Sequence, residues 1–405
     1  MAVTIKPFSA LRPRSDKVSQ VAALPYDVMN TKEAREEVKD NPYSFLHVDK
    51  AEIHFADDAN HYAPEVYAKA KENLEKLKSD GVLIKDNEQM LYVYQVEGYG
   101  KKQTGLATCV SVKEYEQGII KRHEFTRPVK EKDRIDHILA CEAHTGPIFM
   151  AYRDNGEETA PQKIMANWIN NNSPIYDFKS EDGVRHAIWT INDINVISKL
   201  TNAFKNIPYI YIADGHHRNE AAYKAAKDDN LESQFYLAVI FPHTELAILD
   251  YNRIVKELNG LTKEEFLKEI QKIATVKEST TQVKPGQKYE IGMYMANKWY
   301  KLTFNEVSND VIQKLDVSVL QNKVLTPILN ISDPRSDARI DFVGGIRGLG
   351  ELERLVDSGK IAVAFSMFPT TMDELMAVAD SGNVMPPKST WFEPKLRSGL
   401  LIHEF

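Results

Sequence analysis

The pentapeptide Asp214-Gly215-His216-His217-Arg218 constrains this chain more than any other segment, because of the residues on either side of it. The apolar run 209–213 predicts a strand, and the run 219–227 predicts a helix. A strand that leads through a glycine into a helix leaves backbone N–H groups unpaired at the helix start, with the helix dipole behind them. The segment therefore predicts a βα turn that binds an anion.

The side chains of this pentapeptide favour the same interpretation. An arginine in a first helical turn is unfavourable against the dipole, so Arg218 indicates a charged partner such as phosphate. His216 and His217 add donors whose charge changes near neutral pH. Asp214 is placed to hold a metal, orient a histidine or bind a hydroxyl. The alternative is an ordinary βα turn, in which Asp214 and Gly215 serve capping alone and the histidines lie on the surface.

Three properties of the whole chain limit its class. A length of 405 residues exceeds the usual size of one core, so we expect two or three lobes. A net charge of −7 argues against general binding of nucleic acid or acidic membranes. Cys109 and Cys141 form neither a metal framework nor a disulfide scaffold. No run approaches the roughly 20 apolar residues of a membrane span, and no signal peptide is evident, so we expect a cytoplasmic protein.

Strand and helix signals alternate irregularly, which predicts a mixed α/β fold of the α+β type and no single doubly wound sheet. Asp193 predicts the cap of a helix over 194–205. Thr262 and Thr371, each three residues before a glutamate, predict the starts of two further helices. The run 45–48 predicts a short strand.

The charged segment 121–134 is a second cluster of residues that could carry out chemistry. In it, His123 and Glu124 follow a β-prone pair, and a carboxylate at a strand end beside cations is a reasonable general base. No second histidine lies four residues on, so the segment is not a zincin motif. Glu131, Asp133 and Arg134 either belong to the site or hold its loop, and the former is favoured. The alternative for the whole segment is a solvated charged face.

A third cluster is Pro387-Lys388-Ser389-Thr390, in which a cation and two hydroxyls stand on a backbone restricted by prolines. Such a loop suits a carboxylate or phosphate, and a rigid tail is the alternative. The glycines near Gly344 lack Walker spacing. The chain also has no Rossmann fingerprint, nucleophile elbow or zinc spacing, so a hydride-transfer enzyme or a serine hydrolase has little support.

Several of these segments together resemble the bacterial domain-of-unknown-function family 1015 over essentially the whole chain. The matching segments are Lys6-Pro7-Phe8, Leu11-Arg12-Pro13, Pro25-Tyr26-Asp27-Val28, Asn41-Pro42-Tyr43-Ser44-Phe45-Leu46, His123-Glu124, Lys130-Glu131, Asp133-Arg134, Ala213-Asp214-Gly215-His216-His217-Arg218, Met385-Pro386-Pro387-Lys388-Ser389-Thr390 and Gly399-Leu400.

The order of the His-Glu pair, the pentapeptide and the terminal Pro-Lys-Ser-Thr segment is also similar to the archaeal free-serine kinase of the ParB/sulfiredoxin-like superfamily. This resemblance implies a ParB/sulfiredoxin-like phosphate-binding core with additional α/β lobes. We expect lobes at residues 1–120, 121–250 (the core) and 251–405. This chain is far longer than the archaeal kinase, and its Ser389 stands where that enzyme has threonine.

Site roles follow from the same resemblance. It implies Glu124 as the base, with Asp214 and His217 as further catalytic residues. It implies Lys388, Ser389 and Thr390 as the site for the amino-acid carboxylate. The implied phosphate- and nucleotide-binding residues are His123, Arg134, Gly215, His216, His217 and Arg218.

The sequence thus predicts a kinase that transfers a phosphoryl group from ATP, ADP or pyrophosphate to free L-serine, with Mg²⁺ at Asp214. We expect no nucleic-acid or membrane partner, and a homodimer is compatible with this reading. One alternative is a metal-dependent hydrolase that uses Asp214, His216, His217 and Glu124 as ligands. Another is a ParB-like nucleotide-binding regulator coupled to DNA, against which the acidic balance and the lack of a basic helix-turn-helix count.

Overall fold

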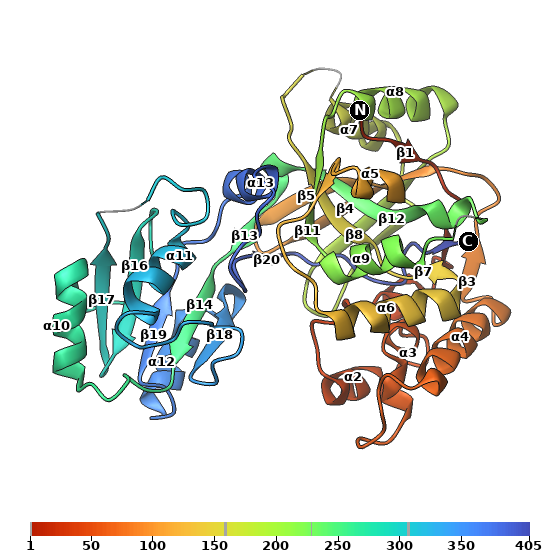
Figure 1. Ribbon diagram of the computed structural model, residues 1–405. Helices are drawn as coiled ribbons and strands as arrows, with labels where there is room; N and C mark the ends of the chain where they lie inside the picture. Colours follow the sequence, from red (N-terminus) through yellow and green to blue (C-terminus); the bar gives the residue numbers. More distant parts are fainter. Residues whose placement is uncertain (1, 158–159, 228, 306–307) are drawn as a thin grey trace. The chain divides into compact units, whose positions relative to one another are not determined.

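The computed structural model of the chain divides into two compact units (Figure 1) and describes residues 2–157, 160–227, 229–305 and 308–405. Unit 1 comprises Met1–Leu246 with Pro394–Phe405, and unit 2 comprises Ala247–Glu393. This division differs from the three expected lobes. Strands from both sides of the 120/121 boundary share one sheet, and the C-terminal segment returns to unit 1. Hydrogen bonding between strands that are distant in sequence decides these borders, and no linear pattern encodes it.

Unit 1 is built on one sheet, in which the described strands follow the order β6-β11-β8-β12-β5-β4-β10-β9, with β1 joined to β5. Neighbours are antiparallel except β11 with β6 and β12 with β8. The bounds are β1 Ile5–Lys6, β4 Leu91–Gly98, β5 Lys101–Ser111, β6 Ile120–Lys121, β8 Ile148–Tyr152, β9 Tyr176–Lys179, β10 Arg185–Ile191, β11 Ile210–Asp214 and β12 Phe235–Pro242.

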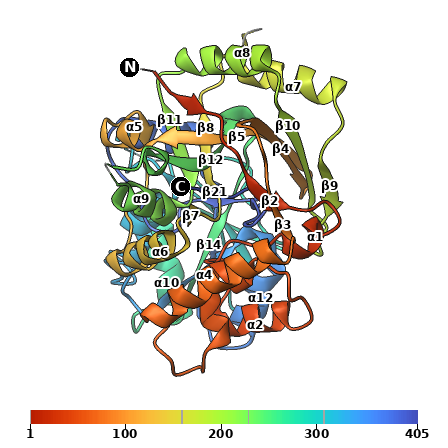
Figure 2. The ribbon, with the colours of Figure 1, turned by 90° about the vertical axis from the view of Figure 1, so that its right-hand side faces the viewer.

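Helices cover this sheet, and its strands β8 and β12 are apolar and buried along nearly their whole length. The pair α7 and α8 packs together at the top of unit 1 in Figure 2, whereas α9 packs against α6, and α6 packs against α4. Leu200 and Phe204 of α8 and Ala221 of α9 belong to the same buried core as the sheet. The helix bounds are α4 Pro64–Ser79, α5 Val112–Glu116, α6 Pro128–Cys141, α7 Pro161–Asn171, α8 Ile194–Lys205 and α9 His216–Ala225.

The N-terminal part of unit 1 forms its own apolar core from short helices and α4. The strand predicted over 45–48 is wrong, because this run forms the helix α3. A four-residue apolar run suits a buried helix as well as a strand, and here Phe45, Leu46 and Val48 are all fully buried in the same core as α4. The bounds are β2 Leu11–Pro13, α1 Val18–Val21, α2 Thr31–Val38, α3 Leu46–Asp49, η1 Ala51–His54, β3 Leu83–Lys85, β7 Ala143–His144 and β21 His403–Glu404.

Unit 2 contains an antiparallel sheet in the order β15-β17-β16-β19-β14-β18. Helix α12 packs on β19 and β16, and its Leu352 lies in the core of this unit. The bounds are β13 Ile248–Leu249, β14 Tyr251–Val255, α10 Lys263–Ile273, β15 Thr275–Ser279, β16 Glu290–Met295, β17 Lys298–Thr303, α11 Asp316–Leu320, β18 Ile340–Gly344, α12 Leu349–Asp357, β19 Val363–Ser366, α13 Met372–Asp380 and β20 Trp391–Phe392.

The two units together confirm the predicted mixed α/β fold of the α+β type. The helix signals were also correct. Asp193 caps α8 by accepting from the N–H groups of Asn195 and Val196. Thr262 and Thr371 form complete capping boxes at α10 and α13. Within the described ranges, no helix has both the length and the apolar character that crossing a membrane requires.

Three buried histidines predict a loss of stability in mild acid. Burial lowers the pKa of His186 to about 3 and the pKa of His123 and His403 to about 4. Histidines of an unfolded chain titrate near 6.5, so between about pH 6.5 and pH 4 the unfolded state binds protons that the folded state does not. Each neutral histidine therefore contributes fully to the free energy of unfolding above about pH 6.5. Below that, down to the folded-state pKa, this contribution falls by about 1.4 kcal/mol per pH unit.

Urea unfolding of the full chain at pH 7.5, 6.0 and 5.0 measures this effect. We expect the free energy of unfolding to drop between each pair of values. A free energy that is equal at all three pH values would contradict the prediction, and a His403→Gln variant should show a shallower dependence.

Candidate functional site

The predicted strand, glycine turn and helix around residue 214 are all present. β11 ends at Asp214, and α9 begins at His216, directly after Gly215. Gly215 has φ +89°, a left-handed conformation that glycine adopts without strain. No side chain caps α9, and the backbone N–H groups of residues 216–218 have no hydrogen-bond acceptor in the described parts of the chain. The first turn of α9 therefore keeps its donors available for an anion. We call Asp214–Arg218 the Gly215 turn.

The guanidinium of Arg218 folds back against this turn. A Cβ atom placed on Gly215 would lie 3.0 Å from Nη2 and 3.1 Å from Nε of Arg218. Nη1 donates to the carbonyl of Pro147 at 2.5 Å. Nε is buried and has no acceptor among the described residues. A buried donor that makes no hydrogen bond lowers the stability of the fold. An anion bound at the turn would satisfy it.

Lys395 is a site residue that the sequence reasoning missed. Its Nζ lies 2.8 Å from Oδ2 of Asp214, whose Oδ1 accepts from the N–H of Gly215 at 2.9 Å. Burial by itself raises the pKa of Asp214, but the positive charges of Lys395 and Arg218 outweigh it and hold this pKa below its ordinary value. The two residues of the pair are 181 positions apart. No local pattern signals such a contact.

His216 connects the turn to the predicted base. Its ring meets His123 edge-on, with centroids 4.4 Å apart, and its Nε2 accepts from the backbone N–H of His123 at 3.5 Å. Burial, and then the neighbouring His123, lower the pKa of His216 far below its ordinary value, so the ring is neutral. With Nε2 as acceptor, the ring proton lies on Nδ1. That atom is 3.8 Å from Oε2 of Glu124, whose side chain is 50% exposed.

His217 holds the same loop at a second point. Its Nε2 accepts from the backbone N–H of Arg127 at 3.1 Å. Burial lowers the pKa of His217, and the nearby carboxylate of Asp27 partly opposes this shift. The structure therefore brings Glu124 beside His216, and His217 holds the loop that follows Glu124 through Arg127. His123 itself lies in the interior, 1% exposed, behind His216.

Glu131, on α6, contacts both the loop that carries Glu124 and the helix α9. Its carboxylate accepts hydrogen bonds from Oγ1 of Thr126 and from Nζ of Lys224 on α9. The carboxylate thus ties the loop that carries Glu124 to the helix that carries the turn. This contact indicates that Glu131 orders the loop, although the sequence reasoning favoured a place in the site.

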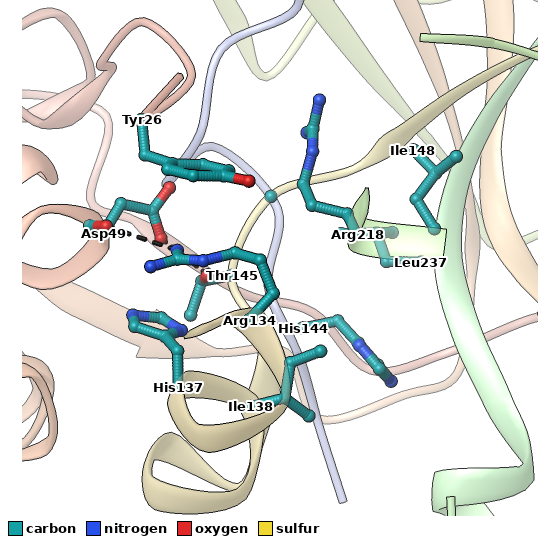
Figure 3. Close-up of a pocket in the computed structure, with 11 residues that line it drawn as sticks. Tyr26, Asp49, Arg134, His137, Ile138, His144, Thr145, Ile148, Arg218 and Leu237 are labelled. Carbon is teal, nitrogen blue, oxygen red and sulfur yellow. Dashed lines mark hydrogen bonds between the residues drawn. The ribbon is translucent and has the colours of Figure 1, made fainter. Parts of the chain in front are cut away.

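Arg134 lies at a small cavity that Arg218 also lines (Figure 3). Arg134 is buried, its Nε donates to Asp133 at 2.9 Å, and its guanidinium lies 3.9 Å from the ring centroid of Tyr26. The cavity has a volume of about 20 Å³, enough for one water. Arg134 therefore lies next to Arg218 across a water-sized space, and its role toward a nucleotide stays a prediction.

The predicted carboxylate loop lies in unit 2 and is bonded internally. Lys388 has φ +54°, and its carbonyl accepts from Nη2 of Arg253 at 3.0 Å. The hydroxyl of the buried Ser389 donates to the carbonyl of Pro386 at 2.6 Å, and Thr370 donates to the Ser389 carbonyl at 2.9 Å. The Ser389 hydroxyl thus already has a partner within the loop. Ligand binding by Lys388, Ser389 and Thr390 stays a prediction.

A metal site requires several ligands that lie close together, so the positions of the predicted ligands bear on whether they could hold a metal ion. In the parts of the chain that the structure describes, no three side chains of His, Cys, Asp or Glu are grouped so that they could hold a metal ion. The ligand set of the hydrolase alternative is therefore not assembled there. Asp214 offers a single carboxylate, which Lys395 already neutralises. Mg²⁺ binding at Asp214 therefore stays a prediction, and it would need further ligands, such as the phosphates of a donor.

Comparison with known proteins agrees with the first resemblance. The model of the family described as "Protein of unknown function (DUF1015)" matches residues 5–318, so the chain belongs to this family. No curated protein matches the chain.

Similar solved structures include free serine kinase in complex with AMP, which is 13% identical, with a TM-score of 0.36 over 73% of this chain and 92% of the other. A conserved hypothetical protein from Pyrococcus furiosus is 13% identical, with a TM-score of 0.35 over 73% and 94% of the two chains. SbnI from Staphylococcus aureus, truncated at its C-terminus, is 12% identical, with a TM-score of 0.38 over 72% and 85%.

Proposed function

We propose that this DUF1015 protein is a phosphotransferase that moves a phosphoryl group from ATP, ADP or pyrophosphate to the hydroxyl of a small acceptor, with free L-serine as the first candidate. The observation that carries the proposal is the joint placement of an uncapped helix start, the Arg218 guanidinium and the half-exposed carboxylate of Glu124. Phosphoryl transfer requires hydrogen-bond donors around the transferred group and a carboxylate that takes the hydroxyl proton.

The Gly215 turn binds the phosphates in this proposal. The N–H groups of residues 216–218 and the free Nε of Arg218 donate to the phosphate oxygens. Lys395 adds a positive charge next to Asp214. Because these groups are held by the fold before a ligand arrives, they stabilise transferring charge without reorganisation.

Glu124 acts as the general base. Neutral His216 presents Nδ1–H toward its carboxylate, which orients Glu124 without neutralising it. His123 supports the ring of His216 from behind, which makes it a positioning residue. Mg²⁺ would shield the phosphate charges, and Asp214, the first residue of the turn, is the carboxylate that would hold it.

Phosphorus NMR tests the function directly. The purified chain is incubated with Mg²⁺ and L-serine, and with ATP, ADP or pyrophosphate in separate tubes. We expect a new phosphomonoester resonance in one of them, which would also identify the donor. Donor hydrolysis without that resonance would retain the phosphate site and discard serine. Intact donors in all three tubes would refute the proposal.

A further inference from the structure

Unit 1 contains a second and larger cavity, of about 230 Å³, to which the proposed function assigns no role. It is formed by the loop before α2, the region around η1, the loop before α4 and the first turns of α6. We call it the Lys130 pocket. Its lining residues are Tyr26, Met29, Asn30, Thr31, Lys50, Glu52, His61, Tyr62, Lys130, Asp133 and Arg134.

The charges of this lining are nearly balanced. Three cations, Lys50, Lys130 and Arg134, face two carboxylates, Glu52 and Asp133. Lys50 pairs with Glu52 at 3.0 Å, and Arg134 pairs with Asp133 at 2.9 Å. Nζ of Lys130 lies 5.8 Å from the ring centroid of Tyr62 and its charge helps lower the pKa of Asp133, but in the described part of the chain no carboxylate lies within ion-pair distance of it. The lining thus has one positive charge in excess, beside two carboxylates that can still accept hydrogen bonds. This pattern suits a monoanion with its own donors better than a doubly charged phosphate.

The volume limits the size of the ligand. Pockets for drug-sized molecules have roughly 300–1,000 Å³, and the Lys130 pocket lies below that range. This volume favours a small acid with a few polar groups over a larger ligand such as a nucleotide.

The pocket adjoins the Gly215 turn. Arg127, the residue just before α6, donates its N–H to His217, and Lys130 follows three positions later in the first turn of α6. Tyr26 and Arg134 line both this pocket and the small cavity of Arg218. Burial lowers the pKa of His217, and the charges of Asp27 and Lys130 act on that ring in opposite directions.

We propose that the Lys130 pocket binds the phosphoryl acceptor, and that this acceptor is a small carboxylic acid carrying a hydroxyl or amino group. Lys130 binds the carboxylate, while Glu52 and Asp133 accept hydrogen bonds from the hydroxyl or ammonium group. The role of this ligand as the phosphoryl acceptor rests on the proposed function, whereas the binding site itself does not. This assignment places the acceptor carboxylate in unit 1 and not at Lys388.

Calorimetry on the full chain tests the site, with L-serine, D-glycerate, glycerol and inorganic phosphate as probes. We expect L-serine or D-glycerate to bind, and the Lys130→Met variant to weaken that binding by about tenfold or more. Lys130→Arg should retain it. Lys132→Met is the matched control, because Lys132 lies on the same helix, is 76% exposed and pairs with Asp136. Binding of glycerol or phosphate that is tighter than that of the acids and is lost in Lys130→Met would overturn the proposal, and so would the absence of any effect of Lys130→Met. Binding of phosphate that Lys130→Met leaves unchanged belongs to the Gly215 turn.

Kinetics separate this inference from the proposed function. If the chain phosphorylates an acceptor, Lys130→Met should raise KM for that acceptor and leave kcat nearly unchanged. Phosphorylation with an unchanged KM would overturn the pocket and keep the phosphotransferase. Lys130-dependent binding of the acid, without any transfer, would keep the pocket and overturn the phosphotransferase.

Discussion

Replacing Glu124 by glutamine should lower the turnover of phosphoryl transfer by about 10²- to 10⁴-fold, the usual contribution of a general base. The amide keeps the size and position of the side chain beside His216 but cannot take the hydroxyl proton. Affinity for the phosphoryl donor should be unchanged, because the groups that donate hydrogen bonds to its phosphates belong to the Gly215 turn. Steady-state kinetics with the donor found by NMR, together with calorimetric titration of that donor, measures both quantities.

Glu116→Gln is the matched control for this experiment. Glu116 is an exposed carboxylate at the end of α5 in the same unit, so its replacement makes the same chemical change away from the turn. It should leave turnover unchanged. Equal turnover of the Glu124→Gln variant and the unmodified protein would remove Glu124 from the mechanism.

Replacing Gly215 by alanine should weaken donor binding by about 10- to 100-fold. The new Cβ would lie 3.0–3.2 Å from three atoms of the Arg218 guanidinium, so that group must shift by a few tenths of an ångström from its position against the turn. A hydrogen bond to a charged group contributes about 1.5–3 kcal/mol, which corresponds to the expected loss. Calorimetric titration with ADP or pyrophosphate measures the affinity.

Gly100→Ala separates this effect from simple backbone strain. Gly100 lies between β4 and β5 with φ +73°, and nothing lies within 4 Å of a Cβ placed there. Both variants carry the cost of a left-handed alanine, about 1–2 kcal/mol of stability, but only Gly215→Ala displaces Arg218. An equal loss of donor affinity in both variants would show that strain, and not the position of Arg218, explains the effect.

The local elements of this protein could be predicted from its sequence. The caps at Asp193, Thr262 and Thr371 were correct because each is a hydrogen bond between residues at most three positions apart. The βα turn was predictable for the same reason, since Gly215 and the strand and helix on either side of it are contiguous. In such cases, the interacting groups are neighbours in every conformation of the chain.

Only the tertiary structure decided which distant groups meet. The pairing of Lys395 with Asp214 spans 181 positions, and the contact of Arg127 with His217 spans 90. The helix at 46–49 and the two-unit division likewise depend on which segments pack and which strands pair. These contacts are selected by the free energy of burying whole elements together, to which no short stretch of sequence contributes enough to reveal the outcome.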